Sequence, residues 1–223
     1  MGNYWDKNKF KKPKEFDIEI LGGDTNEGKE LVIQVSLIGF SDKIVKRKGA
    51  SVGDIVFVTG PFGYSSAGLK ILLSKKKFSK NFAKKAKSAT LRPKTKLEFG
   101  IRAKNYFSSS MDSSDGLSTT LNQLSKQSKK RFVILKIPAN SDLFEFAKLN
   151  KLNAHNMIFN GGEEYEIVFT CSPKNRTKVK NLAKKLRISL REIGYVTKGS
   201  GVIFLQNGKS FRIKDVGWQH SRG

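Results

Sequence analysis

Two aspartates in the stretch SSSMDSSDGLSTTL (108–121) have a spacing that could hold a metal ion. Asp112 and Asp115 lie among serines, just before a segment with helical periodicity. Either aspartate could cap that helix by accepting hydrogen bonds from its free N–H groups. A cap needs only one such residue, however, and two neighbouring carboxylates repel each other unless a cation lies between them. The pair therefore favours Mg²⁺ that holds phosphate groups at a helix N-terminus.

A second acidic stretch, NGGEEYEIVFT (160–170), concentrates Glu163, Glu164 and Glu166 in a basic protein. One interpretation is that these charges protect the exposed edge of a strand from pairing with another chain. The other is that adjacent carboxylates face a cleft and contact a cationic or hydroxylated ligand. The sequence leaves both interpretations open.

A third stretch, GDTNEGK (23–29), has the G-x-x-x-x-G-K spacing of a phosphate-binding loop. Such a loop requires Ser or Thr as its next residue and a helix after it. Here Glu30 follows and the next segment has the pattern of a strand, so the phosphate-loop interpretation is rejected. Asp24, which follows an expected strand, is then either part of a Gly-rich turn or a metal ligand.

Hydrophobic periodicity predicts the elements that would position these residues. Two strands are expected early in the chain, followed by a linker that ends near residue 50. The alternation of strands and helices after that point, with a β-rich end, predicts a mixed α/β (α+β) sandwich. Strands are expected at 16–21, 30–40, 55–60, 131–138, 165–171, 188–197, 201–206 and 210–214, and helices at 63–77, from Leu117, at 141–150 with Ser141 as cap, and from Pro173 to Leu186.

The net charge of +24, from 43 Lys and Arg against 19 Asp and Glu, would attract polyanions, but a lysine-rich soluble protein would share it. From Lys70 to Lys104 there are thirteen basic residues and one acid, Glu98. A solvated helical surface is the favoured interpretation, since Phe78 and Phe82 have a core-packing spacing and not that of a stacking platform. With Cys171 as the single cysteine, no internal disulfide forms and a cytoplasmic location is expected.

Four ordered motifs resemble the thiamine-monophosphate kinase family of the aminoimidazole ribonucleotide synthetase-like superfamily. They are GGDT (22–25), MDSSDGL (111–117), GGEEYEI (161–167) and GWQH (217–220). The resemblance implies that residues 51–223 form the C-terminal α/β sandwich domain of this superfamily. Residues 1–50 would be a remnant of the N-terminal ATP- and metal-binding domain, with part of its sheet and the linker. Most of the sequence expected for that domain is absent.

The resemblance also implies roles for individual residues. Gly23, Asp24, Arg47 and Ser114 match nucleotide contacts; Asp24, Asp112 and Asp115 match metal ligands; Glu163 and Trp218 match substrate contacts. Ser113 and Glu164 depart from the family's usual Val or Ile and Asp at these positions.

The activity implied is Mg²⁺-dependent phosphoryl transfer from ATP to thiamine monophosphate, giving thiamine diphosphate. Several Mg²⁺ ions would neutralise two polyanions, and no catalytic base is expected because the acceptor phosphate, with a second pKa of about 6, is already largely ionised. A homo-oligomer, or a partner that supplies the N-terminal domain, is expected; nucleic acid and membrane are not. Two alternatives remain open: a catalytically silent relative that acts as a binding module, and a basic protein that binds nucleic acid through Lys70–Lys104.

Overall fold

The computed structural model describes residues 18–74, 76 and 78–217, and the chain divides into two units at Phe40 and Ser41. The described residues of the first unit, 18–40, contain no helix and no strand. The prediction of strands is therefore wrong for 18–21 and 30–40, as is the prediction that this segment retains part of a sheet. A strand is stabilised by hydrogen bonds to a neighbouring strand, and no described residue of this unit supplies one.

Residues 41–50, which the sequence assigns to the linker, pack with the second unit. The backbone N–H of Ser110 donates to the Lys46 carbonyl at 3.1 Å, and that of Ala50 donates to the Ser128 hydroxyl at 3.2 Å. The division in the structure therefore precedes the predicted boundary near residue 50 by ten residues.

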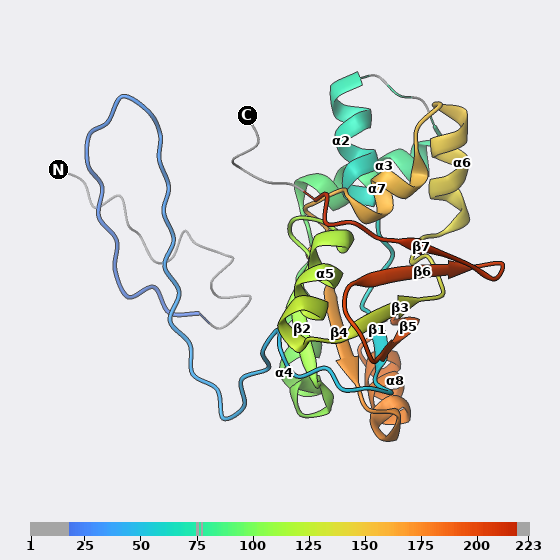
Figure 1. The fold of residues 1–223 in the computed structure, drawn as a ribbon. Coiled ribbons are helices and arrows are strands. Elements are labelled where there is room, and N and C mark those ends of the chain that lie inside the picture. Colours follow the sequence, from blue (N-terminus) through green and yellow to red (C-terminus); the bar gives the residue numbers. More distant parts are fainter. Residues whose placement is uncertain (1–17, 75, 77, 218–223) are drawn as a thin grey trace. The chain divides into compact units, whose positions relative to one another are not determined.

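The second unit is built on one seven-stranded sheet with the order β2-β4-β1-β5-β3-β6-β7 (Figure 1). All neighbouring strands are antiparallel except β3 and β6, which are parallel. The strands expected from residue 55 onward are confirmed, although several are shorter than predicted. One strand, β2, was not predicted. The bounds of the seven strands are β1 Ile55–Val58, β2 Ser109–Asp112, β3 Arg131–Ile134, β4 Ile167–Cys171, β5 Arg191–Thr197, β6 Val202–Gln206 and β7 Lys209–Arg212.

Helices cover both faces of this sheet (Figure 1). The helices are α2 Tyr64–Ser74, α3 Lys80–Leu91, α4 Leu97–Ala103, α5 Leu117–Ser128, α6 Ser141–Leu149, α7 Ala154–Phe159 and α8 Arg176–Lys185, with 3₁₀ turns η2 Lys104–Tyr106 and η3 Pro173–Asn175. The four expected helices are confirmed. Ser141 is not the cap of α6, because the helix already begins there and Asn140 occupies the cap position. None of the helices that the structure describes is long and apolar enough to cross a membrane.

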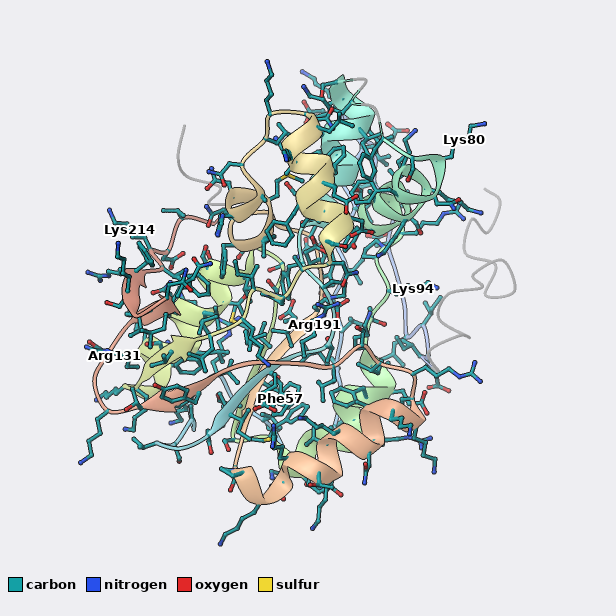
Figure 2. All side chains as sticks on the ribbon, turned by 90° about the vertical axis from the view of Figure 1, so that its right-hand side faces the viewer. Phe57, Lys80, Lys94, Arg131, Arg191 and Lys214 are labelled. Atoms are coloured by element: carbon teal, nitrogen blue, oxygen red, sulfur yellow. The ribbon has the colours of Figure 1, made fainter. Side chains whose placement is uncertain are left out.

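Alternation along β1 divides the core between the two faces of the sheet. Val56 and Val58 are buried in the larger core, against the α5 residues Leu117 and Leu121. Phe57 is buried in the smaller core (Figure 2), which includes residues of α4 and α8. The second unit therefore has three layers, with the sheet between two layers of helices, as expected for the predicted α/β sandwich.

The basic run from Lys70 to Lys104 lies mainly on α3 and the segments beside it. Exposed lysines such as Lys80 and Lys94 point outward (Figure 2). Phe78 and Phe82 pack edge to face with ring centroids 4.7 Å apart, and Phe82 is buried. The core-packing interpretation of these two rings is therefore confirmed.

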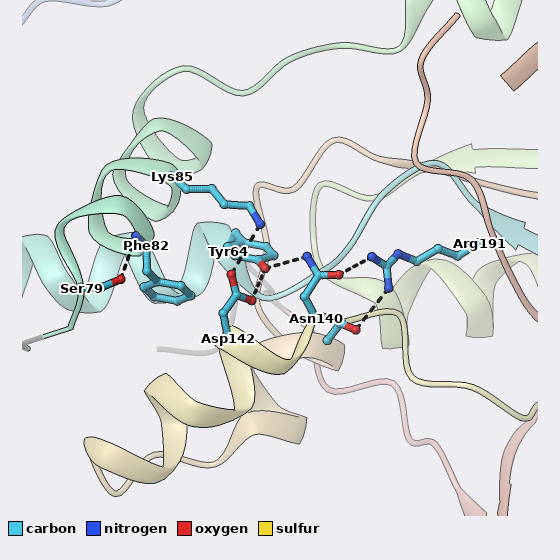
Figure 3. A network of polar contacts seen from close by, with 8 residues as sticks. Tyr64, Ser79, Phe82, Lys85, Asn140, Asp142 and Arg191 are labelled. Carbon is cyan, nitrogen blue, oxygen red and sulfur yellow. Dashed lines mark hydrogen bonds and ion pairs between the residues drawn. The ribbon is translucent and has the colours of Figure 1, made fainter. Parts of the chain in front are cut away.

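A polar network ties this helical layer to the sheet (Figure 3). The buried Tyr64 hydroxyl donates to Asp142 and accepts a hydrogen bond from Asn140 at 2.9 Å. Arg191 of β5 donates to the Asn140 side chain, and the Lys85 ammonium lies 3.9 Å from the Tyr64 ring centroid and 3.6 Å from Asp142. Burial, together with the bond to Asp142, raises the pKa of Tyr64. The network fixes α2, α3 and α6 against β5.

Candidate functional site

The structure places Asp112 and Asp115 on either side of the turn between β2 and α5. Asp112 is the last residue of β2, and α5 begins only at Leu117. The cap position belongs to Gly116, whose φ of 108° favours glycine, and no side chain makes a cap hydrogen bond there. Capping therefore explains neither aspartate, and Ser114 does not cap this helix either.

The acidic loop 161–166 runs directly beside this turn. The backbone N–H of Glu163 donates to the Ser114 carbonyl at 2.6 Å, and that of Tyr165 donates to the Ser113 carbonyl at 3.0 Å. These bonds extend the pairing of β2 with β4, in which Asp112 lies opposite Ile167. The structure thus brings together two motifs that the sequence places about fifty residues apart.

Glu163 and Tyr165 project from the same side of this loop, a relation that the sequence analysis missed. Both residues have left-handed backbone, with φ of 64° and 51°. Such a conformation costs on the order of 1 kcal/mol per residue and is concentrated at functional sites. The Tyr165 hydroxyl donates to Glu163 Oε2 at 2.7 Å. Tyr165 lies two positions after Glu163 in the motif, and this spacing is the signal that could have assigned Tyr165 to the site.

Negative charge gathers around the Tyr165 hydroxyl. Its pKa is raised to about 12, first by the hydrogen bond to Glu163, then by burial and by the charges of Glu163, Asp112 and Asp115. None of the ion pairs among the described residues involves these three carboxylates. The site therefore has uncompensated negative charge that a cation could neutralise.

The chemistry of Asp112 and Asp115 fits Mg²⁺. This ion prefers oxygen ligands and is usually bound by one or two carboxylates together with waters and substrate phosphates. Within 18–74, 76 and 78–217 there is no cluster of three or more His, Cys, Asp or Glu residues that could hold a metal ion. Two aspartates that share the ion with phosphate oxygens and water are consistent with this result, whereas an all-protein cage is not.

Glu164 and Glu166 have structural partners instead. Glu164 is 8% exposed, and its Oε1 accepts hydrogen bonds from the N–H groups of Gly63 at 2.7 Å and Ser65 at 3.0 Å, at the N-terminus of α2. The Glu166 carboxylate accepts a hydrogen bond from the Thr59 hydroxyl at 2.5 Å and forms an ion pair with the Lys96 ammonium group at 3.1 Å. Strand-edge protection therefore explains neither side chain.

Both glutamates also border a pocket of about 190 Å³. Its other lining residues include the basic Arg92, Lys94 and Lys96. These positively charged side chains would repel a cationic ligand. Of the three acidic residues in the motif, only Glu163 fits the interpretation of a carboxylate that contacts such a ligand.

The remaining predicted residues are Gly23, Asp24, Arg47 and Trp218. Gly23 and Asp24 belong to the first unit, where the Asp24 carboxylate accepts hydrogen bonds from the Thr25 N–H at 2.8 Å and from the Asn26 side chain at 3.2 Å. Arg47 is exposed. The carbonyl of the preceding residue, Lys46, accepts a hydrogen bond from the Ser110 N–H of the edge strand β2.

Trp218 lies outside the described residues, but its neighbour Gly217 is informative. A Cβ at Gly217 would lie only 2.2 Å from the Asp115 carbonyl and 2.2 Å from the Thr119 hydroxyl. Glycine therefore allows the chain to pass directly against the turn that carries Asp115. The C-terminal motif GWQH thus begins beside the aspartate pair.

Comparisons with known proteins identify the family of the chain. A family model described as AIR synthase related protein, C-terminal domain, matches residues 51–206. A thiamine-monophosphate kinase from Nitrosopumilus maritimus is 55% identical over 208 residues, which are 93% of this chain and 66% of that protein. A thiamine-monophosphate kinase from Buchnera aphidicola subsp. Schizaphis graminum is 34% identical over 221 residues, covering 96% of this chain and 67% of that protein.

A solved structure of AaThiL complexed with AMPPCP and TMP is 32% identical and superposes with a TM-score of 0.65. The match covers 79% of this chain and 54% of that one. The chain spans about two thirds of the length of the curated relatives that it matches.

Proposed function

The chain belongs to the thiamine-monophosphate kinase family of AIR synthase-related proteins, and we propose that it provides the C-terminal part of a kinase site. The proposed reaction is Mg²⁺-dependent phosphoryl transfer from ATP to thiamine monophosphate, giving thiamine diphosphate. The observation that carries this proposal is the convergence of Asp112 and Asp115 in one turn with Glu163 in the loop beside it. None of the three caps a helix or pairs with a cation among the described residues.

In this proposal Asp112 and Asp115 hold Mg²⁺, with Asp24 as a further ligand. The bound ion would neutralise the phosphates of the two substrates, which otherwise repel each other. Ser114 lies between the two aspartates, where its side chain can contact the same phosphates. Several metal ions, and nucleotide contacts from Gly23 and Arg47, are part of the same proposal.

The substrate side of the site is assigned to Glu163 and Trp218. Thiamine carries a positively charged thiazolium ring, so the Glu163 carboxylate would attract it. Trp218 follows Gly217, which packs against the Asp115 carbonyl. An aromatic side chain at that position would offer a flat face to the cationic ring.

This assignment needs no proton acceptor from the protein. A phosphate monoester has a second pKa of about 6, so the attacking oxygen of the acceptor is already largely ionised near neutral pH. Catalysis then depends on alignment of the two phosphates and on neutralisation of their charge. The carboxylates of Asp112 and Asp115 would hold the Mg²⁺ that supplies this neutralisation, and the Ser114 hydroxyl would help to align the phosphates.

A second candidate is a binding module that holds Mg·ATP without turnover. It is favoured by the presence of only two candidate metal ligands together among the described residues of the second unit. Purified chain incubated with ATP, thiamine monophosphate and Mg²⁺ distinguishes the two candidates. Thiamine diphosphate, quantified by liquid chromatography, supports the kinase; Mg²⁺-dependent ATP binding without product supports the module; absence of nucleotide binding contradicts both.

A further inference from the structure

Two basic segments that are far apart in the sequence meet in the fold. They are KIVKRK (43–48) and KQSKKR (126–131). The Ser128 hydroxyl links them, because it accepts a hydrogen bond from the Ala50 N–H at 3.2 Å and donates to the Arg47 carbonyl at 3.4 Å. The segment that leads into β1 therefore passes beside the C-terminal end of α5 (Figure 1).

A hollow of about 490 Å³ lies where these segments meet. We call it the basic pocket and define it by its four lysines, Lys43, Lys46, Lys48 and Lys130. No Asp or Glu is among the residues that line it, and the remaining wall combines apolar side chains with serine hydroxyls and a glutamine amide. The volume is within the range of about 300–1,000 Å³ that is usual for small-ligand sites.

None of the ion pairs within the described part of the chain involves a lysine of this pocket. Among the residues that the structure describes, four other lysines have carboxylate partners, including Lys96 with Glu166 at 3.1 Å and Lys180 with Glu192 at 3.0 Å. Here the nearest acid in sequence, Asp42, is already paired with Lys104. The ammonium groups of Lys43 and Lys130 donate to the backbone carbonyls of Asn105 at 3.3 Å and Lys129 at 3.4 Å, bonds that leave their positive charge in place. The four lysines that line the hollow therefore focus a positive potential on it.

We propose that the basic pocket binds a short chain of phosphates. Several ammonium groups arranged around a hollow can each contact a different phosphate as a point charge, and the serine hydroxyls can donate to the bridging oxygens. A single sulfate-sized anion would engage only part of this array. Because lysines supply all the positive charge, binding requires no metal ion.

This pocket is separate from the aspartate turn of the proposed kinase site, although Lys46 and Lys48 flank Arg47, the proposed nucleotide contact. Neither Arg47 nor Asp112 is among its lining residues. The inference therefore does not depend on the proposed kinase activity, and the two can fail separately. The phosphate chain could be inorganic or could belong to a nucleotide, and the experiment distinguishes these sources.

The test is calorimetric titration of the full chain with inorganic tripolyphosphate in EDTA at low salt. The triple variant Lys46→Gln/Lys48→Gln/Lys130→Gln should bind tripolyphosphate at least ten-fold more weakly than the unmodified chain. The matched control Lys174→Gln/Lys184→Gln/Lys185→Gln removes the same charge from exposed positions near α8 and should change affinity less than three-fold. Thermal unfolding of both variants verifies that they are folded.

Three results would overturn the proposal: no saturable binding of tripolyphosphate, equal weakening in both triple variants, or binding of ATP without binding of tripolyphosphate. Equal affinity for ATP and tripolyphosphate in EDTA supports it and shows that the phosphate chain alone is recognised. Asp112→Asn should leave tripolyphosphate binding unchanged, which separates this site from the kinase site. Loss of binding in that variant would also contradict the proposal.

Discussion

At the residue scale, the distinction between a cap and a metal ligand can be tested by removing one charge at a time. Asp112→Asn and Asp115→Asn should each weaken Mg·ATP binding about ten-fold or more, because an amide removes a formal charge from the ligand shell of the ion. Asn and Asp cap helices about equally well, so a capping role would predict almost no change. Calorimetry across a range of Mg²⁺ concentrations measures the effect.

The control for this pair is Glu145→Gln, which removes one charge from an exposed position on α6. Its affinity for Mg·ATP should equal that of the unmodified chain. Unchanged affinity and unchanged Mg²⁺ dependence in both aspartate variants would refute the metal interpretation. A loss in Asp115→Asn alone would restrict the ion to that side chain.

Trp218 offers a second test at this scale. If its indole ring stacks on the cationic rings of thiamine monophosphate, the interaction contributes roughly 0.5–2 kcal/mol. Trp218→Leu keeps an apolar side chain but removes the aromatic face, so it should weaken thiamine monophosphate binding about 2- to 30-fold and leave ATP binding unchanged. Separate titrations with each ligand measure both affinities. An equal loss for the two ligands would indicate a packing role instead.

At the scale of the elements, Glu164 connects the acidic loop to helix α2. Burial raises the pKa of its carboxyl group from 4.5 to about 7, although the Ser65 and Gly63 N–H groups oppose this shift. Between pH 4.5 and 7 the folded chain keeps a proton that the unfolded chain releases. The free energy of unfolding should therefore fall as pH rises through this window, by up to about 3 kcal/mol, and level off above pH 7.

Glu164→Gln keeps an acceptor for the α2 N–H groups but does not titrate. Its free energy of unfolding, measured by urea denaturation from pH 5 to 8, should lose most of this slope. Glu145→Gln, which changes an exposed acid, should retain the slope. A slope that is identical in Glu164→Gln and the unmodified chain would contradict the role of Glu164 in the pH dependence.

In the second unit, periodicity predicted six of the seven strands and the helices α2, α5, α6 and α8, but not β2, α3, α4 or α7. Leu117, Leu121 and Leu124 lie one turn apart and are all fully buried on one face of α5. The early strands were predicted wrongly because alternation shows only that a segment could pair, and pairing requires a partner. The role of Glu164 could not be predicted, since its partners Gly63 and Ser65 are about one hundred residues away. The proximity of Asp112 and Asp115 could be predicted, because both residues lie in one short turn.

At the scale of the whole molecule, the segment 30–40 has a composition that favours association with another chain. Its large apolar side chains are exposed, from 74% at Leu37 to 99% at Phe40. Burial of apolar surface is favourable by roughly 25 cal/mol per Å², so contact between such segments from two copies would be stabilised. Alternating apolar residues with unpaired backbone groups also suit strand addition.

We therefore predict that the chain self-associates through this segment at micromolar concentrations. Val35→Lys/Leu37→Glu places opposite charges at two exposed positions without changing the net charge, and it should shift the chain toward monomer in light scattering coupled to size-exclusion chromatography. The matched control Lys29→Glu/Glu30→Lys keeps the net charge and alters no apolar residue, so it should associate like the unmodified chain. Because the substituted residues lie outside the second unit, the thermal unfolding of that unit should not change. A monomeric unmodified chain at 100 μM, a concentration about 100-fold above a micromolar dissociation constant, would show that the exposed segment does not drive association.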